Sequence, residues 1–316
     1  MISSGYIAPE QLKKLSQVRP WRTVWALAFD WLVIVVAISL SVWSGTWWAY
    51  IAAIMVVASR QHALATIMHD LVHYRFIKNR RVTAWIADLV IAWPLFATFN
   101  GYKVNHLDHH KHLNTDDDPD WTAKLGRLEF TFPQEINFAI FNLLGYLICV
   151  SSFRDLRNIQ KRLSKNDNAD PSYKTARLSF YAALAIALTY AGGWILFFTY
   201  WIVPYLTFFL MFNYIRSVAE HFGETLDHSH DLGGTRTVLA SPLETFFLAP
   251  HNVHYHLEHH SFPSVPFYNL PELHRILMDN PEFAAKAHIT RGFIKGLWQE
   301  VAVSYSPQPS SSSSCI

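Results

Sequence analysis

Three clusters of histidines recur along the chain with spacings that place their side chains on one face of a helix. The last of them lies in the segment APHNVHYHLEHHSFPSVP and has the pattern H-x-x-H-H at His256, His259 and His260. Residues three and four apart in a helix lie on the same face, so these three imidazoles can converge on one point. Neutral imidazole is a strong ligand for first-row transition metals. The fold is therefore constrained by the need to assemble a metal site.

Two earlier clusters strengthen this interpretation. His69 and His73 form an H-x-x-x-H pair, and His106, His109 and His110 repeat the H-x-x-H-H pattern. We call the pair box one, the repeat box two and the cluster at 256–260 box three. An all-imidazole ligand set suits iron, zinc, copper or nickel, so the residues alone do not select the metal. The three boxes predict a site for two metal ions, built from helix ends.

The composition places this site beside a membrane. Of the 316 residues, 51% are hydrophobic and only 16% are charged, which is below the usual quarter. The long apolar runs predict four transmembrane helices, at about residues 25–43, 47–68, 176–191 and 194–213. At about 1.5 Å per residue, the second of these is long enough to cross a hydrocarbon core of roughly 30 Å. The predicted fold class is an all-α integral membrane protein with four transmembrane helices and a cytoplasmic histidine-rich helical cap.

Shared metal ligation constrains the topology. Boxes that meet at one site lie on one side of the membrane, so an even number of spans separates them. Residues 83–98 are therefore predicted to lie in the interface or to enter the membrane and return, and residues 136–150 are predicted to lie in the plane of the membrane. The basic residues fall in segments that lie on the same side of the membrane as the histidine boxes. The positive-inside rule then predicts that this side is cytoplasmic. These residues are Lys78, Arg80, Arg81, Arg154, Arg157, Lys161, Arg162, Lys165, Lys174 and Arg177.

Several local predictions follow from single residues. Asp30 is costly inside a span unless it has a partner, and Arg60 is predicted to snorkel. The polar stretch 154–174 is predicted to be an exposed loop, and Asn269 with Glu272 to form a capping box. Carboxylates commonly accept the second N–H of a ligating histidine, and the candidates are Asp70, Asp108, Glu258, Asp118 and Asp120. The histidines predicted to face solvent are His228, His230, His274 and His288.

The motifs HDLVH at 69–73, HLDHH at 106–110 and HLEHH at 256–260 resemble those of the membrane fatty acid desaturase superfamily. The spacing between the boxes is similar too, as are NTDDDPDW at 114–121 and SFPSVPFYNLPELH at 261–274. The resemblance covers roughly residues 45–290. It divides the chain into a cytoplasmic N-terminal segment (1–22), a desaturase domain (23–290) and a C-terminal segment (291–316) with a disordered Ser-rich tail.

The resemblance also implies the ligands and the reaction. The positions matching the family's metal ligands are His69, His73, His106, His109, His110, His256, His259 and His260, with His221 in SVAEHFG as a ninth. Some relatives hold a metal through water with an Asn four residues before that ninth ligand, where this chain has Ser217. The implied cofactor is a pair of iron ions, although the residues themselves suit zinc equally well. With O₂ and two external electrons, such a centre removes two hydrogens from adjacent methylenes, beginning with a hydrogen-atom abstraction, and makes a double bond and water.

The implied substrate is a fatty acyl chain linked to a lipid or carrier, with no nucleic-acid partner. The chain carries no dinucleotide fingerprint, so an electron donor such as a ferredoxin or a small b-type cytochrome is expected to dock, with the basic residues around 78–81 and 154–165 as a hypothetical landing site. One alternative is a hydroxylase, ketolase or other mono-oxygenase of the same superfamily acting on a carotenoid, sphingoid or alkane. A more remote one is a histidine-rich membrane metal transporter or sensor, which would need polar ligands along a path through the midplane.

Overall fold

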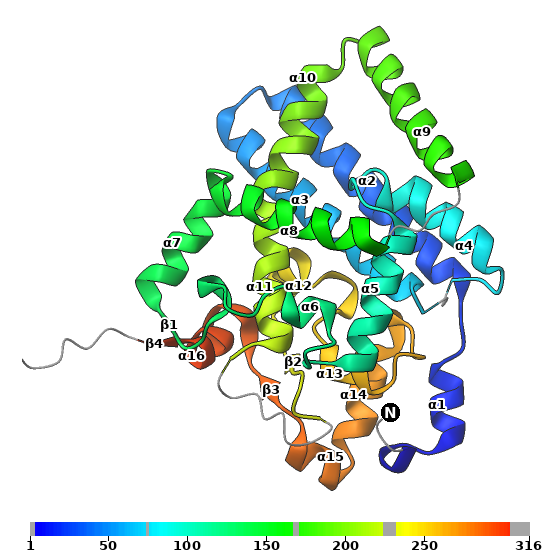
Figure 1. The fold of residues 1–316 in the computed structure, drawn as a ribbon, viewed down its shortest axis with the longest axis vertical. Coiled ribbons are helices and arrows are strands. Elements are labelled where there is room, and N and C mark those ends of the chain that lie inside the picture. Colours follow the sequence, from blue (N-terminus) through cyan, green and yellow to red (C-terminus); the bar gives the residue numbers. More distant parts are fainter. Residues whose placement is uncertain (1–3, 74–75, 167–170, 224–231, 304–316) are drawn as a thin grey trace, which may run out of the picture.

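Three long apolar helices form the frame of the molecule (Figure 1). The computed structural model describes residues 4–73, 76–166, 171–223 and 232–303. The frame helices are α2 (Pro20–Ser44), α3 (Trp47–Leu71) and the continuous stretch Trp194–His221, and each is long and apolar enough to cross a membrane. In its most apolar window α3 is 72% buried and α2 only 22%. The helix α3 is therefore central, and α2 turns one face outward.

The long stretch Trp194–His221 is not uniformly α-helical. It consists of α10 (Trp194–Phe197), the π-helices η4 (Phe198–Ile202) and η5 (Tyr205–Phe209), and α11 (Leu210–His221). Side-chain hydrogen bonds hold it against α3 and α2, because Gln61 donates to the Trp201 carbonyl at 3.0 Å and the Ser41 and Tyr200 hydroxyls lie 2.8 Å apart. This packing fixes the C-terminal end of α11 near the C-terminal end of α3.

Three of the four predicted spans coincide with these frame helices. The fourth prediction, 176–191, falls within α9 (Pro171–Tyr190), which joins α10 through a turn at Gly192 with φ of +63°. By length and hydropathy α9 is not among the span candidates of the described chain. Residues 136–150 form α7 (Ile136–Leu147), which is bent by 83° from the start of α8 (Val150–Asn166) and is a broken span or a re-entrant pair. The four-span count and the in-plane placement stay predictions.

The remaining elements form a cap at one end of the frame helices (Figure 1). Its α-helices are α1 (Pro9–Leu15), α4 (Arg80–Ala87), α5 (Phe99–His112), α6 (Pro119–Thr122), α12 (Pro242–Leu248), α13 (His256–Ser261), α14 (Leu270–Met278), α15 (Pro281–Lys286) and α16 (Trp298–Val301). Short 3₁₀ and π turns are η1 (Ser4–Tyr6), η2 (Asp88–Ala92), η3 (Leu128–Phe130), η6 (Pro250–Asn252), η7 (Phe267–Asn269) and η8 (Gly292–Leu297). Two parallel two-residue pairs join β1 (Gln134–Glu135) to β4 (Ala302–Val303) and β2 (Thr237–Val238) to β3 (Ile289–Thr290).

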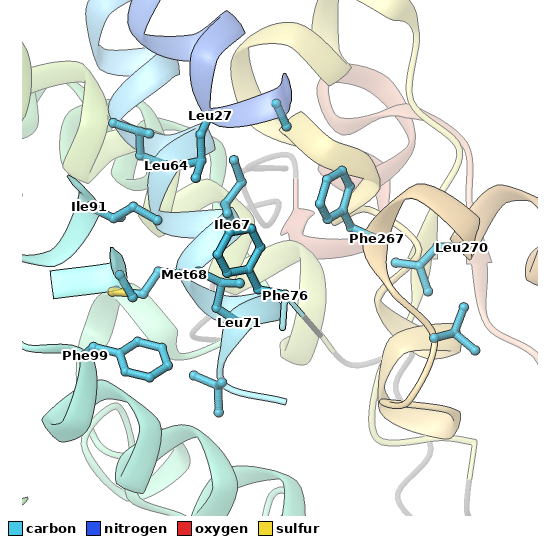
Figure 2. Packing of buried hydrophobic residues seen from close by; sticks show 14 of the residues in the cluster. Leu27, Leu64, Ile67, Met68, Leu71, Phe76, Ile91, Phe99, Phe267 and Leu270 are labelled. Atoms are coloured by element: carbon cyan, nitrogen blue, oxygen red, sulfur yellow. The ribbon is translucent and has the colours of Figure 1, made fainter. Parts of the chain in front are cut away.

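A buried apolar cluster ties the cap to the frame (Figure 2). Leu64, Ile67 and Leu71 repeat on one face of α3 and are fully buried. They belong to the same cluster as Phe99 at the start of α5 and Leu270 at the start of α14. Truncating one such side chain to alanine typically costs about 2–5 kcal/mol. The boxes are thus carried on elements whose positions are set by one shared core.

The buried charge in α2 has two partners. Asp30 accepts hydrogen bonds from Arg60 Nη1 at 2.9 Å and from His251 Nε2 at 2.7 Å, and it is wholly buried. Arg60 is 3% exposed, so the prediction that it snorkels is wrong. The residue also donates to the Phe246 carbonyl at 2.5 Å. This network joins α2, α3 and the segment before box three, and it explains how an acid is tolerated in an apolar helix.

Two local predictions are wrong. The stretch 154–174 is mostly helix rather than an extended loop, because α8 continues to Asn166 and α9 begins at Pro171. The helix α14 begins where expected, but Asn269 is not its side-chain cap. Asn269 donates instead to the Leu15 carbonyl at 2.7 Å, which fixes the end of α1 against the start of α14. His228, His230 and the predicted disordered tail lie outside the described residues.

Candidate metal centre

All nine predicted ligands converge at one place, contributed by four elements. His69 lies on the last turn of α3 and His73 just after it, box two lies on α5, His221 ends α11, and box three forms most of α13. Six of the nine are almost fully buried, and the other three are half-buried. The convergence is produced by the packing of α3 against α11 and of both against the cap. The sequence-based prediction that the boxes meet is confirmed.

The first group comprises His69, His106, His110 and His259, with ligand atoms that all lie within 4.8 Å of one another. His110 Nε2 is 3.0 Å from Nε2 of His106 and 3.0 Å from Nε2 of His259. His73 adjoins this group, since its Nε2 lies 3.3 Å from Nε2 of His106. We call these five residues group one. Its members come from all three boxes.

The second group comprises His109, His221, His256 and His260, which we call group two. Nε2 of His256 lies 2.9 Å from Nε2 of His221 and 3.0 Å from Nε2 of His260. The two groups adjoin, because the rings of His110 and His260 stack with centroids 4.1 Å apart. Neighbouring residues of one box therefore face different groups, as His109 and His110 do.

The donor set fits a transition-metal pair. Two nitrogens bound to one metal at about 2.1 Å and at right angles lie about 3.0 Å apart, which is the spacing seen within each group. Hydrogen bonds alone do not account for it, because a neutral imidazole Nε2 either donates or accepts, whereas His110 Nε2 faces two equivalent nitrogens. His69 Nε2 is buried and has no hydrogen-bond partner among the described residues. A cation in each group would satisfy these atoms.

Some of the histidine ligands lie outside the membrane-spanning helices, and burial keeps these histidines in their neutral form. Desolvation, reinforced by the neighbouring histidines, lowers the pKa of His106, His256, His259 and His260 well below the usual value. The same causes lower the pKa of His110 to about 2. A neutral ring offers a lone pair to a metal, whereas an imidazolium does not. The site is therefore ready to bind cations at neutral pH.

A carboxylate orients one group-two ligand, and a second carboxylate lies near another. His109 Nδ1 donates to Asp118 at 2.8 Å, and Asp118, one of the candidate carboxylates, is fully buried. His256 Nδ1 lies 3.3 Å from Glu220, which Arg216 holds in turn at 2.5 Å. The hydrogen bond to Asp118 fixes the ring of His109 so that its Nε2 would face a bound metal. The sequence analysis missed Glu220, although its position directly before His221 and four residues after Arg216 was a usable signal.

The other candidate carboxylates have different partners or stay untested. Glu258 accepts from His274 Nδ1 at 2.5 Å and from the Thr237 hydroxyl, so its predicted role beside a ligand is wrong. His274 was predicted to face solvent, which is also wrong. His288 likewise lies 2.9 Å from Glu300 and is only 18% exposed. Among the remaining candidates, Asp70 accepts from the backbone of Phe267, Asp120 accepts from Asn105, and Asp108 is exposed.

A cavity of about 210 Å³ lies against the two groups. His69, His106, His109, His221 and His256 are among the residues that line it. Apolar side chains from α3, η5 and the segment before α5 also line it, together with charged or amide side chains from α5, α6, α8 and α11. A substrate placed there would lie directly beside the metal ligands.

The sequence profile of the fatty acid desaturase family matches residues 45–292, a range that contains every residue of groups one and two. This chain belongs to the fatty acid desaturase family. It is therefore an oxidoreductase of the desaturase type. The family assignment agrees with the helical fold, the apolar frame helices and the clustered histidines.

Named relatives show the range of this family. The dihydrorhizobitoxine desaturase of Bradyrhizobium elkanii is 29% identical, and the match covers 90% of this chain and 84% of the relative. The sn-1 acyl-lipid omega-3 desaturase (ferredoxin) of Nostoc sp. is 25% identical over 66% of this chain and 61% of the relative. The human sphingolipid delta(4)-desaturase/C4-monooxygenase is 27% identical over 76% of this chain and 68% of the relative. The family's members thus differ in substrate and in reaction outcome.

Proposed function

We propose that this protein is an O₂-dependent desaturase that introduces a C=C bond at a di-iron centre. Group one would hold one iron and group two the other. The observation that carries the proposal is the presence of two adjacent all-imidazole groups at the wall of a cavity in a chain of the desaturase family. The substrate expected from the family is an aliphatic chain, such as a fatty acyl chain linked to a lipid or carrier.

The bound iron would supply the O₂ activation that an unactivated C–H bond requires. In balance, two C–H bonds on adjacent carbons are broken and one C=C bond is formed. O₂ is reduced to two waters by those two hydrogens, two external electrons and two protons. The chain's own residues would set the geometry. Asp118 holds the Nδ1 side of His109, Glu220 lies 3.3 Å from Nδ1 of His256, and the cavity would place the substrate beside the ligands.

The membrane placement belongs to the same proposal. We place groups one and two on the cytoplasmic side, with residues 1–22 before a desaturase domain at 23–290 and a C-terminal segment after it. This orientation is supported by the exposed basic residues Lys78, Arg80 and Arg81, which lie between box one and box two in sequence. A cysteine-accessibility scan of residues 78–81 in sealed vesicles tests it, because labelling only from the outside face would contradict it.

An external electron donor completes the proposal. Relatives named as ferredoxin enzymes support a ferredoxin as the donor class, with a b-type cytochrome as the other candidate. The exposed basic residues at 78–81 would attract an acidic donor through long-range electrostatics. Changing Lys78 and Arg80 to Glu should lower donor-dependent turnover at low salt and have little effect at high salt. Identical kinetics at both salt concentrations would remove this docking site from the proposal.

A hydroxylating mono-oxygenase on the same scaffold is the second candidate. It is favoured by one relative whose name combines a desaturase and a C4-monooxygenase activity. Product analysis after expression in a host that supplies electrons separates the two outcomes. A product 2 Da lighter than its substrate supports desaturation, and one 16 Da heavier supports hydroxylation. A His259→Ala control, which removes a group-one ligand, should abolish either product while the protein stays in the membrane.

A further inference from the structure

An open groove of about 720 Å³ lies beside the first turns of α2. It is separate from the cavity beside groups one and two, because no residue lines both. Its walls come from α2, from the segment of α12, η6 and η7, and from Arg60 of α3. Six of its lining residues are aromatic, namely Trp21, Trp25, Phe29, Phe246, Phe267 and Tyr268. The groove is thus mainly apolar and lies at one end of a candidate membrane span.

A stripe of exposed apolar side chains continues from this groove along α2. Its members follow one another at intervals of three or four residues, which places them on one face of the helix. They are Trp25, Phe29, Leu32, Val36 and Leu40, with exposed fractions between 44% and 71%. Trp25 and Phe29 belong to both the stripe and the groove. A hydrocarbon chain lying on the stripe would therefore reach into the groove.

Arg22 supplies a positive charge in the groove lining. Its guanidinium carbon lies 5.4 Å from the ring centroid of Trp21 and 5.1 Å from that of Tyr268. These aromatic contacts hold the guanidinium in place without neutralising it. Within the described part of the chain, Arg22 forms no ion pair with an acid. Arg19 adds a second cation close by, because its backbone N–H donates to the Tyr268 hydroxyl at 2.7 Å.

The other charged groups near the groove are already engaged. Arg60 bonds to Asp30 at 2.9 Å and is 3% exposed, and His251 lies 2.7 Å from the same acid. Asp70 accepts the backbone N–H of Phe267 at 3.2 Å and is 4% exposed. Neither Asp30 nor Asp70 lines the groove, and its described lining contains no acid. The charge that the groove presents to a ligand is therefore positive.

The dimensions match one leaflet of a membrane. Half of a hydrocarbon core of roughly 30 Å corresponds to about ten residues of helix at 1.5 Å each. The stripe covers about 16 Å from Trp25 to Val36 by the same rise. Arg22 lies about one turn before Trp25, which is where a headgroup would lie if the tail followed the stripe. Exposed tryptophans at this level are typical of a membrane–water interface.

We propose that the groove is a binding site for an anionic phospholipid of the bilayer. Its phosphate is bound by Arg22, and one acyl chain lies on the stripe from Trp25 to Val36. The site depends on α2 crossing the membrane but not on the proposed desaturase reaction. This lipid has a supporting role rather than that of substrate, since no groove residue lines the cavity at the metal ligands.

The test uses the full-length protein, purified in detergent and washed free of native lipid. Phosphatidylglycerol is added, bound lipid is counted by native mass spectrometry, and the thermal unfolding midpoint is recorded. Diacylglycerol with the same acyl chains lacks the phosphate, and glycerol phosphate lacks the chains. We expect phosphatidylglycerol to bind about 10-fold or more tightly than either probe. It should also raise the unfolding midpoint the most, because it binds the folded state.

Variants locate the site. Arg22→Gln should weaken phosphatidylglycerol binding by about 10- to 100-fold, to the level of diacylglycerol, whereas Arg22→Lys should stay within a few-fold of wild type. Arg275→Gln is the matched control, because Arg275 is exposed on α14 and lies 3.8 Å from Asp279. Phe29→Ala should weaken the binding of both lipids a few-fold, and Phe141→Ala, at an exposed position on α7, should not.

Three results would overturn the inference. They are equal phosphatidylglycerol binding by Arg22→Gln and Arg275→Gln, equal binding of phosphatidylglycerol and diacylglycerol by the wild type, and binding of glycerol phosphate as tight as that of the lipid. The lipid-free unfolding midpoint shows whether each variant is folded. If Arg22→Gln does not fold, the comparison of the three probes on the wild type and on Arg22→Lys decides the question.

Discussion

Asp118 is not itself a predicted metal ligand, but substituting it should lower the affinity of the site for metal. It accepts four hydrogen bonds: from His109 Nδ1 at 2.8 Å and from the backbone N–H groups of Asn114 at 2.9 Å, Asp120 at 2.8 Å and Trp121 at 3.2 Å. In Asp118→Asn one oxygen still caps α6, but the new NH₂ faces two donors. His109 must then shift its proton to Nε2 or rotate, and either change removes its lone pair from group two.

The size of the effect follows from comparable outer contacts. Loss of a carboxylate that orients a ligating histidine lowers metal affinity about 10- to 100-fold, or about 1.4–2.8 kcal/mol. Anaerobic Fe(II) titration of the metal-free protein against a chelator of known affinity measures it. Asp108→Asn is the matched control, because Asp108 lies in the same box but is exposed. Equal iron affinity in Asp118→Asn and Asp108→Asn would refute the claim that Asp118 orients His109.

Three further substitutions test the frame and the cap, each by thermal unfolding in detergent. Asp30→Ala leaves Arg60 buried without its acid and should cost about 3–5 kcal/mol; an unchanged midpoint would mean that the pair is not formed. Burial alone would raise the pKa of Glu300, but its donors, Arg236 included, lower it to about 2. Its contribution to stability is therefore present above about pH 4.3 and is lost as the pH falls towards 2. Glu300→Gln should remove this part of the acid sensitivity, and an identical pH profile would contradict it. Gly223→Ala should cost about 1–3 kcal/mol, because φ is +119° and the new Cβ would lie 2.8 Å from Arg236 Nη2; wild-type stability would show that the strain is absent.

The metal ligands were predictable from the sequence where their spacing alone places them on one face of a helix. His256, His259 and His260 share a helical face by spacing alone, and the repeated spacing in the other boxes indicated a shared site. The division into two groups was not predictable, because it depends on how α5 and α13 cross. Adjacent residues such as His109 and His110 project in different directions from one helix, and only the packing decides which group each one joins.

Helices were predictable from the sequence where a long apolar run specifies them. They were not predictable where contacts with distant parts of the chain determine the local structure. The first two apolar runs became α2 and α3, since neither run contains a Pro or a Gly after its first residue. The polar stretch 154–174 looked like a loop, but α8 is stabilised by contacts that the local sequence does not show, such as Asp155 with Arg127. In the same way, Asn269 is a residue type that commonly caps helices, yet its side-chain amide donates a hydrogen bond to the Leu15 carbonyl instead.

The account depends most on two metal ions bound side by side by histidines of three distant boxes. The direct measurement is the iron-to-chain ratio of the purified full-length protein, determined for wild type, His259→Ala in group one and His260→Ala in group two. The account predicts two irons per chain in the wild type and about one in each variant. A wild-type ratio of one or less, or variants that retain the full wild-type content, would contradict it.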